Sequence, residues 1–156
     1  MIRPATRADA PRIAAIWNAV VRDTALTFTS REKTLTEIAA MLDRAPVLVA
    51  ERGGGTAGFA TYGPFRPGPG YAHTREHSVH LAAQARGQGL GRALLTALEQ
   101  EARQQGIHVL IAAIAGENAG GIAFHAALGY REVGRLMQVG WKFDRWHDLV
   151  LMQKTL

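Results

Sequence analysis

The sequence predicts a single α+β domain. Its 156 residues are enough for one compact unit with a buried core, and 47% of them are apolar, an ordinary share for a globular protein. Segments with helical periodicity and segments rich in strand-forming residues follow each other along the chain. No internal repeat and no long linker interrupts them, so residues 1–156 are treated as one domain.

The expected elements alternate irregularly, as in α+β rather than α/β proteins. We expect strands at residues 1–5, 47–51, 57–63, 72–82, 109–115, 130–139 and 149–156. We expect helices at residues 10–22, 35–42, 90–104 and 118–128.

Local signals in the first half support these boundaries. Pro11 falls in the first turn of the first helix, where proline is tolerated, and Ile13 and Val20 lie on its apolar side. The second helix stops before Pro46. The glycines at 53–55 separate two apolar runs and predict a β-hairpin.

The second half of the sequence has equally clear signals for a loop, a central strand and the ends of a helix. The segment PFRPGPG at residues 64–70 predicts a surface loop. Residues 109–115 are all apolar, which is typical of a strand at the centre of a sheet. Asn118 suits the N-cap of the last helix, and Gly129 suits its C-terminal end.

The most informative segment is the turn RGQGLGR at residues 86–92, between a strand and a helix. Closely spaced glycines let backbone N–H groups converge, and the helix that follows adds its own free N–H groups and dipole. The turn therefore suits a pyrophosphate, with Arg86 and Arg92 as additional cations. It matches neither the P-loop pattern nor the GxGxxG dinucleotide pattern. A tight turn without a ligand remains the alternative.

Composition excludes several classes. The absence of cysteine excludes disulfides, thiolate nucleophiles and cysteine-based zinc sites. No apolar stretch approaches the ~20 residues needed to cross a bilayer, and we expect no signal peptide. The net charge of +5 suits an anionic partner, but the basic residues are scattered, as on an ordinary solvated surface. We expect no nucleic-acid or membrane partner.

The turn, read with its surroundings, resembles the pyrophosphate-binding motif of the GNAT superfamily of acyl-CoA N-acyltransferases. The resemblance covers essentially the whole chain. The strings YAHTREHSVHL (71–81), NAGGIAFHAALGY (118–130) and VGWKFDRWHDLVLMQ (139–153) narrow it to the phosphinothricin and methionine sulfoximine acetyltransferase branch.

This resemblance implies a central mixed, mostly antiparallel, twisted sheet, flanked by helices and splayed at its middle strands. It implies acetyl-CoA as co-substrate and no metal. It also implies a cytoplasmic homodimer that acts on a small-molecule amine. The coenzyme-binding residues it implies are Val79, His80, Leu81, Arg86, Gly87, Gln88, Gly89, Leu90, Gly91, Arg92 and Asn118.

Acetyl transfer needs a base for the amine, a donor for the thioester oxygen and a way to release the thiolate. The resemblance places the base at Glu76, directly or through a water. It places the oxygen's donor at a backbone N–H near Leu81, turned by a bulge in this strand. His125 would lie near the sulfur, where it either protonates the thiolate or only contacts the coenzyme. Tyr130 is expected in the core.

An amino-acid acceptor carries a carboxylate, so its site needs a cation and an apolar wall. The candidates are Phe28, Phe65, Arg66, Arg75, His77 and His147. Core packing is the alternative for the phenylalanines, and a bond to Asp148 or a backbone carbonyl is the preferred one for His147. The chain departs from the branch at Thr29 and Ala72, where relatives have arginine. His73, His77 and His80 are close in sequence, but strand alternation argues against a metal site.

The predicted function is transfer of acetyl from acetyl-CoA to the amine of phosphinothricin, methionine sulfoximine or methionine sulfone. The alternative acceptors are a protein N-terminus, a polyamine or an aminoglycoside. A rival from another class is a non-catalytic acyl-CoA-binding module, against which the carboxylate of Glu76 argues. A nucleic-acid-binding protein would need a basic stripe with interleaved aromatic residues, which the sequence lacks.

Overall fold

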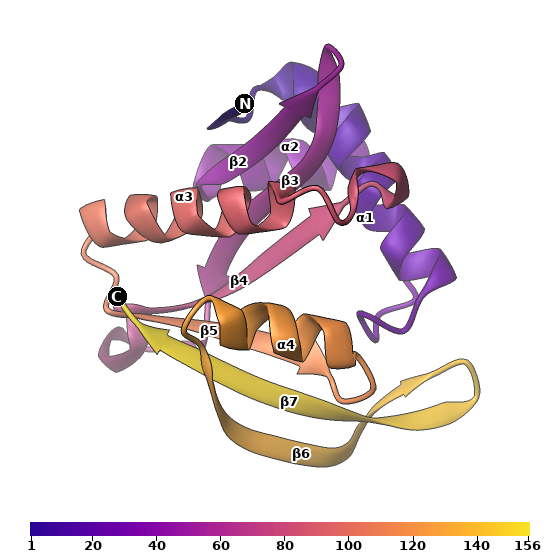
Figure 1. Cartoon of the computed structure of the whole chain (residues 1–156), viewed down its shortest axis with the longest axis vertical. Coiled ribbons are helices and arrows are strands. Elements are labelled where there is room, and N and C mark those ends of the chain that lie inside the picture. Colours follow the sequence, from indigo (N-terminus) through magenta and orange to yellow (C-terminus); the bar gives the residue numbers. More distant parts are fainter.

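The computed structural model, which describes residues 1–156, is organised around one seven-stranded sheet (Figure 1). The strands are β1 (Ile2–Pro4), β2 (Val47–Arg52), β3 (Gly55–Pro64), β4 (Thr74–Leu81), β5 (Val109–Ala115), β6 (Arg131–Lys142) and β7 (Arg145–Thr155). Their order is β1-β2-β3-β4-β5-β7-β6, and only β4 and β5 are parallel. The predicted mixed, mostly antiparallel sheet is confirmed.

Four helices cover the two faces of the sheet. They are α1 (Ala10–Asp23), α2 (Leu35–Arg44), α3 (Leu90–Gln104) and α4 (Ala119–Ala127). α1 and α2 pack on one face around Ile13, Ile38 and Phe59. α3 and α4 cover the other, which is the near face in Figure 1, around a core that includes Leu94 and Leu110. None of the helices is long and apolar enough to span a membrane.

The helix boundaries follow from their caps. Thr34 and Glu37 form a capping box at the start of α2, in which each side chain accepts a hydrogen bond from the other residue's backbone N–H. Asn118 caps α4 by accepting from the N–H of Gly121 at 2.9 Å. Gly129 follows α4 with φ of 89°, a left-handed conformation that favours glycine. These signals were visible in the sequence, and the predicted boundaries hold to within two residues.

The sheet opens between β4 and β5, as the resemblance implied. These strands pair only from Thr74–Val109 to Glu76–Ile111, and beyond that point they diverge (Figure 1). β4 stays paired with β3 up to Leu81, and β5 stays paired with β7. The expected bulge in β4 is wrong, because its register with β3 is continuous. β4 remains paired with β3 and β5 with β7, and these different pairings are sufficient to separate β4 from β5.

The C-terminal hairpin is longer than predicted. β6 continues to Lys142 and β7 begins at Arg145, so the turn is only Phe143–Asp144. Both turn residues have positive φ, 54° and 56°, as a tight two-residue hairpin turn requires. Because neither residue is glycine or asparagine, the sequence carries no turn signal here.

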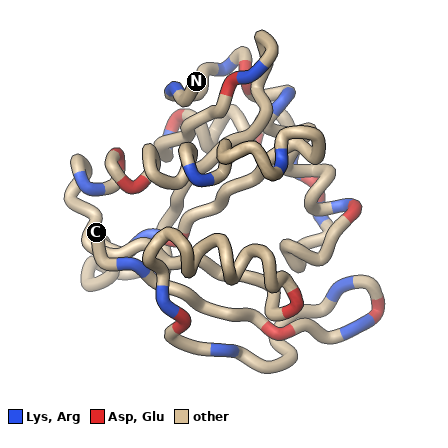
Figure 2. The backbone as a smooth tube through the Cα atoms, viewed as in Figure 1, with Lys and Arg blue, Asp and Glu red and all other residues tan.

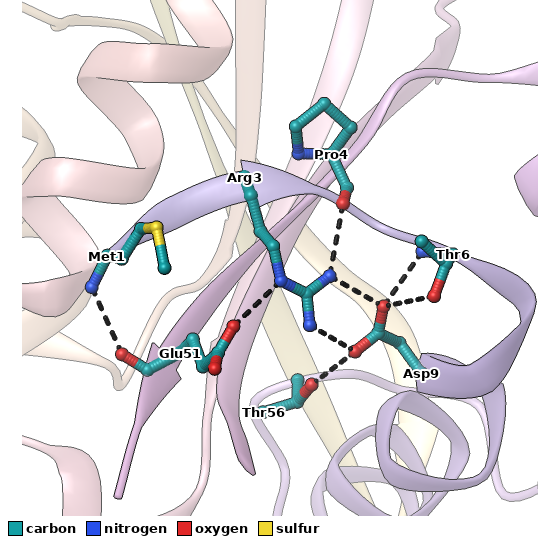
Figure 3. A network of polar contacts seen from close by, with 7 residues as sticks. All are labelled: Met1, Arg3, Pro4, Thr6, Asp9, Glu51 and Thr56. Carbon is teal, nitrogen blue, oxygen red and sulfur yellow. Dashed lines mark hydrogen bonds and ion pairs between the residues drawn. The ribbon is translucent and has the colours of Figure 1, made fainter. Parts of the chain in front are cut away.

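A partly buried polar network fixes the N-terminus to the sheet (Figure 3). The guanidinium of Arg3 donates to both carboxylate oxygens of Asp9, at 2.9 and 3.0 Å, and to Glu51 at 2.8 Å. Asp9 also accepts from the backbone N–H of Thr6 and the hydroxyl of Thr56. The network ties β1, β2 and β3 to the residues that precede α1.

Basic residues do not gather into a stripe. Lys and Arg are spread over the molecule with Asp and Glu among them (Figure 2). Arg7, Arg22, Arg31 and Arg145 form ion pairs with exposed carboxylates. The surface charge therefore has the scattered character that the sequence predicted.

Candidate active site

A cavity of about 350 Å³ lies where β4 and β5 separate. β4 and β5, the start of α4 and the segment after α1 line it. Seven of the lining residues were predicted from the sequence to belong to the site, namely Phe28, Glu76, His77, Val79, His80, Asn118 and His125. The splay therefore brings together residues that are far apart in the chain.

The backbone of β4 presents free hydrogen-bonding groups along this opening. The N–H of Ala82 donates to Ala57, on the β3 side, at 2.9 Å. Because backbone groups alternate in direction along a strand, those of Leu81 and Val79 point the other way, toward the opening. No strand pairs with them there. An extended ligand with amide groups can bind along this edge as an additional strand would.

The glycine-rich turn lies at the end of β4 and the start of α3. Gly87 and Gly89 have φ of 72° and 79°, and Gly89 is the N-cap of the helix. No side chain caps this end, so the first N–H groups of α3 remain available. Arg86 and Arg92 flank the turn and are exposed. This geometry suits a pyrophosphate in line with the free edge of β4.

Glu76 lies between this cavity and a second one of about 710 Å³. Its carboxylate forms no hydrogen bond or ion pair, so a structural pairing with Arg75 is not present. The side chain is exposed to the two cavities, but the protein around the carboxylate partly desolvates it and raises its pKa above the ordinary glutamate value. A free carboxylate with a raised pKa suits a general base.

The second cavity carries two arginines. Arg44 from α2 and Arg75 from β4 line it with Glu76 and Trp17. The Nε of Arg75 is buried and has no hydrogen-bond partner. Neither guanidinium forms an ion pair, so this cavity can accept an anionic group beside the carboxylate of Glu76.

Phe28 is held in the wall of the first cavity by the C-terminal hairpin. The imidazole of His147 stacks on its ring with 5.2 Å between centroids. Lys142 is buried and donates to the carbonyls of Val21 and Thr27, at 2.6 and 2.8 Å. The hairpin therefore positions the segment that follows α1.

His147 has a structural role in this arrangement. Its Nε2 lies 2.9 Å from the carbonyl oxygen of Lys142 and must donate to it. It lines neither cavity. This contact fits the preferred interpretation, a strand histidine held by a backbone carbonyl, and acceptor binding by His147 stays a prediction.

Two other predicted acceptor residues do not reach the site. Phe65 packs edge-on against Tyr71, and the guanidinium of Arg66 lies 5.7 Å from the same ring. Neither residue lines either cavity. The loop folds back on itself through a short 3-10 turn, Pro69–Tyr71, and this keeps both side chains away from the cavities.

The three neighbouring histidines point in different directions. His73 bonds the carbonyl of Gly106, whereas His80 packs against Trp17 with 5.7 Å between rings. His77 faces α4, where its Nε2 lies 3.0 Å from Nε2 of His125. The side chain of His77 therefore lines the part of the first cavity next to α4, and it does not line the second cavity. No group of three or more potential metal ligands is present.

Sequence reasoning missed some residues of the site. Trp17 lines both cavities, although its spacing indicated only the apolar side of α1. No local pattern in the sequence distinguishes Arg44 or Lys142 from an ordinary surface cation. Ala113 lines the first cavity because β5 has diverged from β4 before this residue. Only the tertiary structure places these residues.

A strand edge with free amides, an anion site at a helix start and an unpaired carboxylate define an acyl-CoA-dependent N-acyltransferase. Residues 2–151 match the family described as Acetyltransferase (GNAT) domain, and the chain belongs to this family. It is an acetyl-CoA-dependent N-acetyltransferase, as the sequence predicted.

Named relatives agree with this assignment. An L-methionine sulfoximine/L-methionine sulfone acetyltransferase from Pseudomonas paraeruginosa is 44% identical, over 99% of this chain and 94% of the relative. Two solved structures cover all of this chain. One, a ribosomal-protein-alanine N-acetyltransferase from Brucella melitensis, has a TM-score of 0.96, 48% identity and 99% coverage. The other is a phosphinothricin acetyltransferase from Sinorhizobium meliloti in complex with AcCoA, with a TM-score of 0.95, 31% identity and 88% coverage.

Proposed function

We propose that this acetyltransferase acts on the primary amine of a small amino-acid-like acceptor, of the methionine sulfoximine, methionine sulfone or phosphinothricin type. The observation that carries the proposal is the free carboxylate of Glu76 between two cavities. One cavity follows the open edge of β4, and the other carries two unpaired arginines. The names of the relatives from Pseudomonas and Sinorhizobium support the same acceptor class.

The acetyl donor binds along β4 in this proposal. The glycine-rich turn at residues 86–92 and the N-terminus of α3 hold its pyrophosphate. The free backbone groups of Val79 and Leu81 pair with its amide groups, and Asn118 lies against the same arm. The bound coenzyme supplies an activated acetyl group as a thioester. A backbone N–H on the free edge of β4 between Val79 and Leu81 donates to the thioester carbonyl oxygen as negative charge develops there.

The acceptor approaches from the side of the second cavity. Arg44 of α2, on the same face of the sheet as Glu76, binds its carboxylate, and the amine of the acceptor faces Glu76. Glu76 takes the proton of the ammonium, directly or through a water, which frees the nitrogen lone pair. The nitrogen then bonds to the acetyl carbon, and the carbon–sulfur bond breaks with its electron pair on the sulfur. The excess proton of the nitrogen passes through solvent to the thiolate, which leaves the amide and the free thiol. Phe28 provides an apolar wall beside the reacting groups.

The test is thiol release from acetyl-CoA with a panel of amines. The panel contains methionine sulfoximine, methionine sulfone, phosphinothricin, free amino acids, a polyamine, an aminoglycoside and a peptide with N-terminal alanine. Turnover confined to the first three supports the proposal. Turnover of the peptide alone would assign the enzyme to protein N-termini, in line with the Brucella relative's name. Coenzyme binding without turnover of any amine would favour a non-catalytic binding module.

We also propose a homodimer that works in the cytoplasm. The support for the dimer is an exposed apolar surface on the β6–β7 hairpin, made of Val133, Leu136, Met137, Val139, Trp141, Phe143 and Trp146. β6 is the edge strand of the sheet, where such a surface favours association. The absence of cysteine suits a reducing compartment. Sedimentation velocity on the purified chain tests the dimer, and a monomer at micromolar concentration would exclude it.

A further inference from the structure

His77 and His125 meet across the cleft at the point where β4 and β5 separate. The last paired residues of these strands are Glu76 and Ile111, and His77 is the next residue along β4. Its Nε2 lies 3.0 Å from Nε2 of His125 on α4. The side chain of His77 is buried, and Tyr130 packs edge-on against both imidazoles at 5.3 and 5.2 Å.

The other contact of His125 fixes the positions of the protons. Nδ1 of His125 lies 2.7 Å from the carbonyl oxygen of Gly121, which can only accept. Nδ1 therefore carries a proton, and in the neutral ring Nε2 is an acceptor. His77 must then donate its own Nε2–H. Burial keeps both imidazoles neutral, since it lowers the pKa of His125 and lowers that of His77 to about 3.

This arrangement leaves the pair without a proton for a departing thiolate. The single N–H of His125 is bonded to Gly121, and the single N–H of His77 is bonded to His125. The only ring nitrogen without a partner is Nδ1 of His77, which carries a lone pair and not a proton. Of the two roles expected for His125, the geometry favours contact without proton transfer.

The hydrogen bond between His77 and His125 lies where few other contacts join β4 to β5 and α4. Beyond Glu76 no backbone hydrogen bond joins β4 to β5, and α4 has no fully buried residue of its own. Ile122 and Phe124 of α4 pack against the core around Leu94 and Leu110, but both are only partly buried, so few apolar contacts fix α4 relative to β4. α4 nevertheless brings His125 and Gly121 to the cavity, next to its cap residue Asn118. The hydrogen bond between the histidines is a direct link between the two walls.

We propose that His77 is a positioning residue, which replaces the missing β4–β5 pairing by its hydrogen bond to His125 and so fixes α4 as the wall of the acetyl-donor cavity. In this arrangement His125 shapes the cavity and transfers no proton. The proposal rests on the proposed function, because that assigns the cavity to acetyl-CoA.

The first test is nitrogen NMR on histidine-labelled wild-type protein at pH 7, alone and with acetyl-CoA. The expected spectrum shows two neutral rings, His125 protonated at Nδ1 and His77 at Nε2, with assignments from His77→Gln and His125→Asn. A cationic His125, or one protonated at Nε2 alone, would overturn the proposal. This measurement needs no acceptor, so failure of the proposed function, seen as wild-type protein without thiol release, is a separate result.

The second test compares acetyl-CoA binding by calorimetry with turnover. His77→Leu removes the donor at similar size, and we expect the Kd for acetyl-CoA to rise about tenfold, the equivalent of one hydrogen bond, with a smaller change in kcat. His77→Gln keeps an N–H at the reach of Nε2 and should restore most of the affinity. His125→Asn keeps the donor to Gly121 but not the contact to His77, so adding His77→Leu to it should change little.

Two kinetic outcomes would contradict the proposal. One is a large loss of kcat in His125→Asn with acetyl-CoA affinity intact, which would mean that His125 acts in the chemistry itself. The other is unchanged Kd and kcat in a folded His77→Leu protein, which would mean that the hydrogen bond fixes nothing. Thermal melts of each variant establish that it is folded. The NMR experiment on wild-type protein needs the variants only to assign the two rings.

Discussion

The ring of Phe28 lies so close to Gly140 of β6 that a Cβ on Gly140 would overlap the ring carbons. The two residues are far apart in sequence, and the glycine has no positive φ that would otherwise require it. The ring fits where it does because β6 presents bare backbone at this point. A residue outside the cavity therefore determines where one cavity wall lies.

Gly140→Ala should displace Phe28 from the wall of the first cavity and lower turnover. Overpacking of this kind costs about 1–3 kcal/mol, so we expect kcat/KM to fall by about tenfold or more. Steady-state kinetics with both substrates varied measures this. Gly134→Ala is the matched control on the same strand, because a Cβ there meets nothing within 4 Å. Equal effects of the two variants would contradict the assignment.

Lys142→Met should destabilise the fold. The variant leaves the carbonyls of Val21 and Thr27 without their buried donor, which costs about 1–3 kcal/mol of unfolding free energy. Urea denaturation gives the difference, and Arg131→Met, at an exposed position of the same strand, is the control. A loss no greater than that of the control would mean that the two carbonyls are satisfied in another way.

The acid limb of the pH profile should report Glu76. A base works in its deprotonated form, so kcat/KM should rise as pH increases through the pKa of this carboxyl. Because burial raises that pKa, the limb should lie above the range of an ordinary glutamate. Glu76→Gln should abolish the limb and most of the turnover, with acetyl-CoA binding retained. Glu132→Gln, outside both cavities, should keep the wild-type profile.

Gly89→Ala should weaken acetyl-CoA binding. The left-handed backbone at this N-cap costs a residue with a Cβ about 1–2 kcal/mol, and relief of that strain would redirect the N–H groups at the start of α3. The Kd from calorimetry should rise, whereas Gly70→Ala, in a loop with ordinary φ and open space around it, should leave it unchanged. An unchanged Kd in Gly89→Ala would argue against the turn as the pyrophosphate site.

Asp9→Asn should lower stability at neutral pH by about 1–3 kcal/mol, because the network around the carboxylate loses its charge and some of its hydrogen bonds. The guanidinium of Arg3 holds the pKa of Asp9 far below its ordinary value. The stabilisation is therefore present above the unfolded-state pKa, about 4, and is lost as pH falls toward the folded-state pKa.

Thermal melts between pH 2 and pH 7 measure this effect. The variant should show a shallower loss of stability below about pH 4 than the wild type, since it lacks this titrating group. Asp23→Asn, whose exposed pair with Arg22 contributes little, is the control. Parallel curves for Asp9→Asn and the wild type would contradict the assignment.

Local chemistry explains which parts of the fold could be predicted. Asn118, Gly129 and the glycine-rich turn act on backbone groups only a few residues away in the sequence. The sequence alone therefore locates the helix ends that lie next to them. The turn at Phe143–Asp144 has no such signal, because its positive φ angles are imposed by the pairing of β6 with β7. The hairpin strands were therefore predicted too short.

The residues of the candidate site also fall into those that the sequence predicts and those that only the fold places. Glu76 and His125 lie in strings with a recognisable pattern, and the structure brings both to one cavity. Their chemical roles stay predictions. Arg66 was chosen by charge and proximity in sequence, and a turn within its own loop removes it from the site. Arg44 reaches the second cavity from α2, a placement that depends on how a helix lies over the sheet.

The strand order has a consequence for the synthesis of this protein. β7 follows β6 in the chain, yet it lies between β5 and β6, so the backbone edge of β5 has no partner until residues 145–155 have been made. Likewise, Thr27 and Phe28 lack their contacts until Gly140 and Lys142 of β6 have been made. A nascent chain can therefore form the first half of the sheet before the wall of the first cavity assembles. Deletion of β7 should yield a chain in which the backbone edge of β5 is exposed.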